Sequence, residues 1–453
     1  MQATKVLSFL SILFLSMILW TAPAYAVGDD MPQSLQGLID KAKEGDTLQL
    51  QDKTYLGPIN INKRLIIEGN GACIKATTSG NTVELRADGI ELNDISVLPA
   101  REGIDEKDAA IWVGSNGNII QNCVVQESYY GIHLENAQNN VFVGNHILGD
   151  PEQKFNDKGA GIMSEYSSNN EFVNNRIENV GDGIYFYYSY SNIIKKNFIT
   201  EARYAIHLMD DSKNNKIISN KLEHNITGIM TMLAQDTLII GNEITNQYDY
   251  HGTGIIIYSS ERTSILQNLV SDNTRGIQMS DSWGTLMKEN NVRTNYSGMV
   301  LGECLQATDI SRNNFIGNIQ QYTAVEDSTS PVAEVKGNYW DDYNGFDENG
   351  DGIGDKIYQH GKTYFEIISG ARENLQVFFN SPAMVMLASI QSMDKSSAVY
   401  DPYPLMKPVI TDTKAAENPA TSYVDLHAIV GLIVFLAGCV TTIVLGRGHS
   451  WKN

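Results

Sequence analysis

Residues 175–209 read NRIENVGDGIYFYYSYSNIIKKNFITEARYAIHLM and contain two copies of one phrase. Each copy opens with an Asn that is followed two positions later by an apolar residue, and a Gly-Ile or Ala-Ile step begins eight positions after the Asn. The phrase recurs roughly every 22 to 24 residues from about residue 93 to residue 340, apart from a few insertions. The Asn falls at Asn122, Asn145, Asn175, Asn197, Asn220, Asn242, Asn268, Asn290, Asn314 and Asn338, and the second step begins at Gly131, Gly161, Gly183, Ala205, Gly228, Gly254, Gly276 and Gly298. Because two independent markers keep one period, the sequence predicts a solenoid of stacked repeats.

The pattern inside each repeat predicts strands and not helices. Around Gly183 the apolar residues Ile184 and Phe186 alternate with Tyr185 and Tyr187, whereas a helical repeat would space them by three and four. We therefore expect an all-β right-handed parallel β-helix, in which each coil buries its inward side chains against the next coil, about 4.8 Å away. The repeated Asn residues are expected to form an amide ladder at a turn, each bonded to its neighbour one coil along.

The two ends of the chain predict export and a membrane anchor. Lys5 precedes an apolar run and Ala24-Tyr25-Ala26 is typical of a cleavage site, so residues 1–26 are predicted to be a signal peptide. An uncharged stretch within 426–446 is long enough for a transmembrane helix. Its basic flank predicts a cytoplasmic tail over 447–453, and 407–425 resembles a linker. A buried core helix is the alternative for the apolar stretch.

The remaining parts of the chain are expected to close the solenoid. Residues 27–92 are predicted to hold a capping helix around Leu35, Leu38, Ile39 and Ala42, followed by the first coils. Residues 93–340 carry the repeats, and 341–406 are predicted to form a C-terminal cap with an Asp-rich loop. With a net charge of −20, the chain is too acidic for a nucleic-acid binder. Its four cysteines, Cys73, Cys123, Cys304 and Cys439, follow no disulfide or zinc pattern.

The outward positions after each Gly-Ile step are the candidate functional positions. The first outward position reads His133, Met163, Tyr185, His207, Met230, Ile256, Gln278 and Val300, and the second reads Glu135, Glu165, Tyr187, Met209, Met232, Tyr258 and Ser280. His207 and Met209 should share one strand, with Met230 and Met232 on the next. Imidazole and thioether donors favour Cu(I), so these four residues are predicted copper ligands.

Two alternatives remain for this face. The methionines could pack under a loop or a partner, because Met adapts to irregular contacts. Tyr185, Tyr187, Tyr188 and Tyr190 could instead support a sugar.

An Asp-rich loop follows the last repeat. Asp347, Asn349, Asp351 and Asp355 occupy positions 1, 3, 5 and 9 of an EF-hand-type loop, with the Ile353 carbonyl at position 7. Tyr358 stands where the usual bidentate Glu would be. The loop is a predicted structural calcium site, and a metal-free Asp/Gly turn is the alternative.

Two insertions interrupt the period. The distance from Asn to Gly is 8 or 9 in most coils, but it is 16 between Asn145 and Gly161 and 12 between Asn242 and Gly254. The first insertion carries Asp150, Glu152, Asp157 and Lys158; the second carries Tyr248, Asp249, Tyr250 and His251. Insertions in solenoids often lie on the working face, so both loops are predicted to bind a partner, with Tyr248, Asp249, Tyr250 and His251 as the leading contact residues and simple length variation as the alternative.

The end of the solenoid resembles a known family. The runs Gly337-Asn338-Tyr339-Trp340-Asp341-Asp342-Tyr343, Asp351-Gly352-Ile353-Gly354-Asp355 and Asp401-Pro402-Tyr403-Pro404-Leu405 are similar to the end of NosD-family proteins. The repeat resembles the wider group of carbohydrate-binding and sugar-hydrolase β-helices with a pectin-lyase-like fold. This resemblance implies a periplasmic, non-enzymatic accessory protein for maturation of the copper centre of nitrous oxide reductase. Its implied partners are an ABC ATPase, a membrane permease, a copper-chaperone lipoprotein and the reductase. The C-terminal membrane segment predicted from the sequence departs from family members that lack one, and it would anchor the protein in the inner membrane near the permease.

An enzyme acting on polysaccharide, such as a lyase or C5-epimerase, is the main rival. That chemistry needs a base together with a cation that stabilises charge. The outward positions offer His133, Glu135 and Glu165 but no Arg or Lys, and His133 with Glu135 is more simply explained as an exposed polar pair. No Asp-Pro-His-Asp motif of an alginate epimerase is present. A surface scaffold without a ligand is a third possibility.

Overall fold

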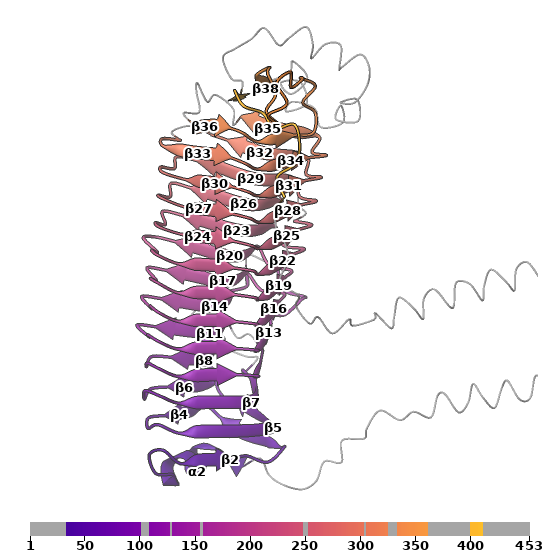
Figure 1. The fold of residues 1–453 in the computed structure, drawn as a ribbon. Coiled ribbons are helices and arrows are strands. Elements are labelled where there is room, and N and C mark those ends of the chain that lie inside the picture. The colour runs from indigo at the N-terminus through magenta and orange to yellow at the C-terminus, as the bar shows by residue number, and fades with distance from the viewer. Residues whose placement is uncertain are drawn as a thin grey trace, which may run out of the picture.

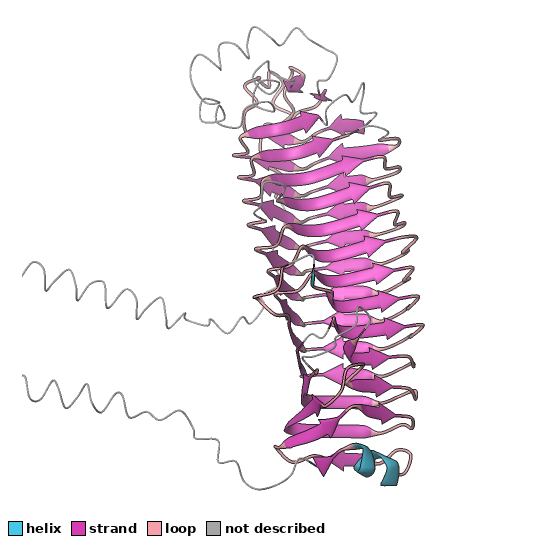
Figure 2. Cartoon of the chain, turned by 180° about the vertical axis from the view of Figure 1, so that it is seen from behind, coloured by secondary structure: helices cyan, strands magenta, loops and turns pink. Residues whose placement is uncertain are grey.

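The computed structural model describes residues 33–100, 108–126, 129–154, 157–247, 252–302, 305–324, 333–360 and 399–410. These residues form an elongated parallel β-helix, seen from two sides in Figures 1 and 2. The strand pairs of the stacked coils are parallel, so the predicted solenoid is confirmed.

One face of the solenoid is a 12-stranded sheet that contains the Gly-Ile steps. Its strands, in spatial order, are β4 (Ile59–Ile61), β6 (Val83–Leu85), β8 (Ala109–Val113), β11 (Tyr130–Glu135), β14 (Ala160–Glu165), β17 (Asp182–Tyr187), β20 (Tyr204–Met209), β23 (Thr227–Met232), β26 (Thr253–Tyr258), β29 (Arg275–Ser280), β32 (Ser297–Leu301) and β35 (Gln320–Ala324). Since each coil adds one strand, residues 21 to 30 positions apart in the sequence become neighbours on this face.

The other faces belong to a 25-stranded sheet. It begins with β1 (Gln33–Ser34), β2 (Thr47–Gln49), β3 (Thr54–Gly57) and the longer strands β5 (Ile66–Ala76) and β7 (Glu91–Leu98). One stack follows through β9 (Ile119–Gln121), β12 (Val141–Val143), β15 (Glu171–Val173), β18 (Ile193–Lys195), β21 (Lys216–Ile218), β24 (Leu238–Ile240), β27 (Ser264–Leu266), β30 (Leu286–Lys288), β33 (Thr308–Ser311) and β36 (Ala333–Lys336). The other follows through β10 (Val124–Gln126), β13 (His146–Leu148), β16 (Arg176–Glu178), β19 (Phe198–Thr200), β22 (Lys221–Glu223), β25 (Glu243–Thr245), β28 (Leu269–Ser271), β31 (Asn291–Arg293), β34 (Asn314–Ile316) and β37 (Tyr339–Trp340).

The core is a set of identical contacts repeated along the axis. Ile162, Ile184, Ile206 and Ile229 are partners in register on the 12-stranded sheet, and all four are fully buried. The Gly of each Gly-Ile step is needed because the coils approach closely there: a Cβ on Gly183 would lie 2.4 Å from the carbonyl oxygen of the next coil. Such close stacking matches the density of protein interiors.

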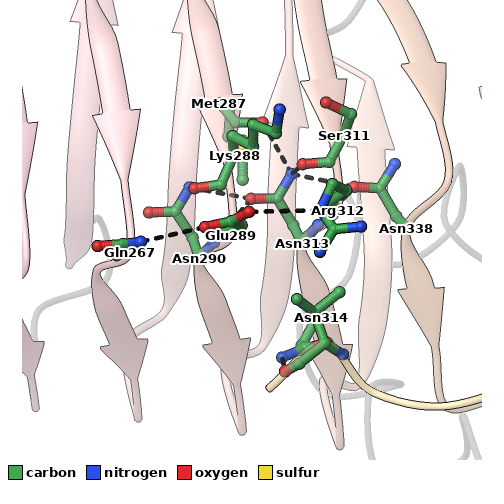
Figure 3. Close-up of polar contacts among 11 residues, drawn as sticks. Gln267, Met287, Lys288, Glu289, Asn290, Ser311, Arg312, Asn313, Asn314 and Asn338 are labelled. Atoms are coloured by element: carbon green, nitrogen blue, oxygen red, sulfur yellow. Dashed lines mark hydrogen bonds and ion pairs between the residues drawn. The ribbon is translucent and has the colours of Figure 1, made fainter. Parts of the chain in front are cut away.

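Buried amides form the predicted ladder, with two positions corrected. Asn145, Asn175, Asn197, Asn220, Asn242, Asn268, Asn290, Asn313 and Asn338 bond to one another in that order. Figure 3 shows the last three. The first position is held by Cys123 and not by Asn122, whose backbone is left-handed with φ of 54°. The later position is Asn313 and not Asn314, which binds the backbone of Val409.

Two further amide ladders were not predicted. One runs through Asn118, Asn140, Asn170, Asn192 and Asn215, and the other through Asn225, Gln247, Asn273, Asn295 and Asn318. Each occupies a different turn of the coil, so several turns are held by buried amides.

The described ends pack against the outermost coils. The six-residue helix α2 (Gln36–Lys41) lies at the N-terminal end, where Leu35 and Ile39 are fully buried and Leu38 only partly. At the other end β38 (Tyr358–His360) pairs antiparallel with β39 (Val399–Asp401). The ring of Trp340 stacks between Phe315 and Tyr358, with centroid separations of 4.3 and 4.4 Å.

Several predicted segments lie outside the described residues. These are the signal peptide, the linker beyond residue 410, the membrane helix and the cytoplasmic tail. Among the helices in the described ranges, none is both long and apolar enough to span a bilayer.

Candidate functional site on the outer face of the 12-stranded sheet

The predicted outward residues form a continuous stripe. His133, Met163, Tyr185, His207, Met230, Ile256, Gln278 and Val300 are successive partners in register, and we call this set the outer stripe. His133, Met163 and His207 are only 5%, 6% and 8% exposed, although their side chains face away from the core. These outward side chains of the outer stripe are therefore largely shielded from solvent by neighbouring side chains on the same face.

A buried carboxylate, Asp182, lies at the centre of this surface. Its side chain is 4% exposed, and its Oδ2 lies 2.9 Å from Nδ1 of His207. Arg203 donates two hydrogen bonds to Oδ1, from Nε at 3.0 Å and from Nη2 at 2.8 Å. A buried charge requires such partners, because it has lost its hydration. Asp182 thus holds an imidazole and a guanidinium from the next coil in one network.

Two tyrosine rings enclose His207. Tyr185 stacks on the imidazole at 4.6 Å with an interplanar angle of 12°, and Tyr204 lies 4.7 Å away at 46°. The Tyr185 hydroxyl donates to the Met209 sulfur at 3.2 Å. Burial, assisted by the negative charge of Asp182, raises the pKa of Tyr185 above its ordinary value. The phenol therefore stays protonated at neutral pH and remains a donor.

The four predicted copper ligands lie on β20 and β23. His207 and Met230 are direct partners in register, while Met209 pairs with Tyr187 and Met232 with Tyr258. Neighbouring strands are about 4.8 Å apart, so imidazole and thioether come close on one face. This donor set fits Cu(I). Within the described ranges no group of three or more His, Cys, Asp or Glu side chains is placed to hold a metal ion, so a metal here would depend on the thioethers.

His133 is not part of an exposed pair, and that expectation was wrong. Its Nε2 lies 3.5 Å from Oε2 of Glu165 on the next coil, and the ring of Tyr130 lies 4.9 Å from the imidazole. Glu135 instead accepts a hydrogen bond from Nε1 of Trp112 at 3.2 Å. The register between coils, which aligns Glu135 with Glu165, decides these contacts.

The Asp-rich loop satisfies its own oxygens. Asp347 accepts hydrogen bonds from the backbone N–H groups of Gly350, Asp351 and Gly352, and Asp351 accepts one from Ile353. The side chains of Asn349 and Asp355 likewise accept from backbone N–H groups of the loop. The structure gives no support to the calcium prediction, because the carboxylates bond to the turn and do not converge on a shared point.

The first insertion packs beside Asp182. The carbonyl of Gly159 accepts hydrogen bonds from the backbone of Gly181 and Asp182, at 2.8 and 3.2 Å, and Lys158 is buried. The second insertion, with Tyr248, Asp249, Tyr250 and His251, lies outside the described residues, and its partner-binding role stays a prediction.

The family model described as "Periplasmic copper-binding protein (NosD)" matches residues 59–217 and 143–345. Together these matches cover more than half of the chain and include the whole outer stripe. The chain belongs to the NosD family.

Two NosD relatives match most of this chain. "Probable ABC transporter binding protein NosD" of Stutzerimonas stutzeri is 26% identical over 398 residues, covering 83% of this chain and 90% of the relative. The protein of the same name from Pseudomonas aeruginosa is 28% identical over 428 residues, covering 83% and 91%. A solved structure, the A-module of mannuronan C-5 epimerase AlgE6 from Azotobacter vinelandii, covers 67% of this chain and 93% of its own, with a TM-score of 0.54 and 16% identity. That likeness shows a shared β-helix fold.

An aromatic edge borders the outer stripe of this NosD-family chain. Tyr166 and Tyr188 stack at 5.3 Å, and Tyr187 meets Tyr188 edge-on at 4.7 Å. Tyr166 is 47% exposed, and both Tyr166 and Tyr188 have left-handed backbones, with φ of 47° and 45°. A shallow depression of about 290 Å³ continues along this edge, lined by Tyr188, Asp210, Asp211, Leu233, Gln235, Ser259 and Glu261.

The residue that reasoning from the sequence missed is Asp182. The position before each second step reads Tyr130, Ala160, Asp182, Tyr204, Thr227, Thr253, Arg275 and Ser297. Asp182 is the single carboxylate in this column, which was the available signal. The sequence analysis considered only the first and second outward positions after each Gly-Ile step, and Asp182 belongs to neither.

Proposed function

We propose that this NosD-family chain is a periplasmic, non-enzymatic accessory protein that binds Cu(I) and presents it for assembly of the copper centre of nitrous oxide reductase. The observation that carries the proposal is the pairing of His207 with Met230 in register, with Met209 on the same strand as His207. Soft sulfur and imidazole nitrogen on a rigid sheet suit a monovalent copper ion. The family description as copper-binding and periplasmic supports the same conclusion.

The net charge of −20 supports a cation as cargo. An acidic protein raises the local concentration of cations around it, which speeds their capture. Copper is here a transferred ion and not a resident cofactor. A copper-chaperone lipoprotein would supply it, and the reductase would receive it.

The chain would also act as a docking platform for an ABC permease and its ATPase. The names of its relatives, which call them ABC transporter binding proteins, support this part of the proposal. The loop of Tyr248, Asp249, Tyr250 and His251 is the proposed contact, because it joins β25 to β26, only two strands from β20 on the 12-stranded sheet. A C-terminal membrane helix would keep the solenoid near the permease.

A Cu(I) competition titration of the full-length protein against a chromogenic chelator tests the copper role. We expect one tightly bound ion, lost when Met230→Leu and Met232→Leu are combined, since leucine keeps the apolar volume but removes the sulfur. Met406→Leu, which does not lie on the 12-stranded sheet, is the matched control and should bind normally. Equal affinity of the double variant and the wild type would reject this site, and no binding by the wild type would reject the copper role.

A polysaccharide-binding or polysaccharide-modifying role is the second candidate. The exposed ring of Tyr166 beside Tyr187 and Tyr188 favours it, because aromatic faces support sugar rings. Incubation with uronate polymers should then give products that His133→Ala abolishes. If the protein neither binds these polymers nor releases a product from them, the polysaccharide role is rejected.

A further inference from the structure

We infer that Asp182 is a positioning residue that holds His207 in the tautomer with the proton on Nδ1, so that Nε2 is the nitrogen offered to the ligand. The identity of that ligand as Cu(I) rests on the proposed function; the tautomer does not.

The hydrogen-bond pattern determines the tautomer. An ionised carboxylate can only accept, so the ring nitrogen 2.9 Å from Oδ2 must carry the hydrogen. Arg203 directs both of its hydrogen bonds to Oδ1, which leaves Oδ2 to His207. A planar guanidinium with two donors is suited to keeping a carboxylate ionised in a buried place.

The surroundings also fix the orientation of the ring. Tyr185 stacks on one side of His207, and the tilted ring of Tyr204 lies at a similar distance. Rotation of the imidazole would break the bond to Asp182 and disturb both aromatic contacts. The backbone N–H of Asp182 donates a hydrogen bond to the carbonyl of Gly159, which fixes the position of the Asp182 backbone and so restricts where its carboxylate can lie.

The unprotonated Nε2 then carries the lone pair. Among the residues that the structure describes, no hydrogen-bond donor is seen at this nitrogen, although Met230 is the in-register neighbour of His207. Histidines that bind metals commonly donate their other ring N–H to a carboxylate, which orients the ring and raises its basicity. Loss of such a partner typically costs about 10- to 100-fold in metal affinity.

His133 provides an internal comparison. Its contact with a carboxylate, Glu165, is made through Nε2 and is longer, at 3.5 Å. Of these two buried histidines on the outer stripe, His207 is the one whose Nδ1 is held by a carboxylate at hydrogen-bond distance.

Nitrogen NMR of full-length protein labelled with ¹⁵N-histidine tests the inference without any metal. The spectra would be recorded well above the ordinary His pKa of about 6.5, with His207→Gln used to assign the signal. We expect His207 to be protonated on Nδ1 in the wild type. In Asp182→Asn the amide can donate to Nδ1, so the proton should move to Nε2. Protonation of Nε2 in the wild type would overturn the inference, and this measurement requires no variant of Asp182 to fold.

Cu(I) titration of the same proteins links the tautomer to the ligand. Affinity should fall about 10- to 100-fold in Asp182→Asn. Asp236→Asn is the matched control, because Asp236 also forms a two-bond pair with an arginine, Arg262, but contacts no histidine, and it should bind normally. A switched tautomer with unchanged affinity would overturn the role of Nε2. Wild type that shows the expected tautomer but binds no Cu(I) would reject the proposed function and leave the positioning role of Asp182 in place.

Discussion

At the scale of single residues, the buried amides give this solenoid its regularity. Asn197 is fully buried, and its side chain makes four hydrogen bonds. Its Oδ1 accepts from the backbone N and the Nδ2 of Asn175, at 2.9 and 3.0 Å, and its Nδ2 donates to the carbonyl of Phe172 and to Oδ1 of Asn220, at 2.9 and 3.0 Å. One side chain therefore connects three coils, and its loss would leave polar groups unpaired in the core.

Replacement of Asn197 by alanine should lower the free energy of unfolding by about 2 to 4 kcal/mol, because several buried donors and acceptors lose their partners at once. Urea denaturation followed by circular dichroism would measure the change. Asn122→Ala is the control, since Asn122 is exposed and lies beside the ladder; it should cost no more than about 1 kcal/mol. Similar losses in both variants would contradict a special role for the ladder.

At the scale of elements, one carboxylate attaches the C-terminal segment to the last coil. Asp401 of β39 is fully buried. It accepts hydrogen bonds from the backbone N–H of Gly337 and Asn338, from Nδ2 of Asn338, from Nε1 of Trp340 and from the backbone of Tyr403. The carboxylate of Asp401 thus ends the amide ladder, because it accepts the hydrogen bonds that Asn338 donates and has no N–H group of its own to satisfy. A stack of coils otherwise leaves unpaired groups at its end.

Asp401→Ala should destabilise this end by about 3 kcal/mol, because the donors that Asp401 satisfies would remain buried without an acceptor. Hydrogen exchange should rise first at Gly337, Asn338 and Trp340, with central coils such as β17 and β20 unaffected, as expected when neighbours alone are coupled. Asp281→Ala, at an exposed turn, is the control and should leave the exchange unchanged. Uniform faster exchange along the solenoid would argue against a local attachment.

At the scale of the whole molecule, burial of neutral acids makes the fold sensitive to alkali. Burial raises the pKa of the Cys123 thiol from 9.0 to about 12. Burial, with the nearby charge of Asp342, also raises the pKa of Tyr358 well above its ordinary value. Above about pH 9 the unfolded chain loses these protons while the folded chain keeps them. The unfolded state then binds fewer protons, so stability must fall as pH rises.

We expect the free energy of unfolding to fall by about 1.4 kcal/mol between pH 8 and pH 10 through Cys123 alone, because the slope approaches about 1.4 kcal/mol per pH unit once the unfolded thiol is ionised. Denaturation curves at several pH values would measure the slope. Cys123→Ala should reduce it, since the thiol that titrates is gone. An unchanged slope would mean that Cys123 does not contribute.

The repeat, the strands and the inward residues were predictable because they depend on local alternation. Ile184 and Phe186 are buried, while Tyr185 and Tyr187 face outward, as the pattern predicts. The ladder was predicted one residue off at two places. Asn313 and Asn314 are equivalent in a simple count, and the position beside Asn122 is occupied by Cys123, which a search for repeated Asn does not detect. Calcium received no support, since spacing alone does not distinguish a metal loop from a turn in which Asp347 bonds to its own backbone.

The amino-acid sequence by itself determined that this chain is a parallel β-helix with His207 and Met230 on one outward face, because period and alternation are properties of neighbouring residues. Only the tertiary structure decided which groups meet around them. Asp182 reaches His207 across 25 residues, and Asp401 reaches Asn338 across 63. The first contact depends on the register between neighbouring coils, and the second depends on the return of the chain over the last coil. No local sequence pattern specifies either.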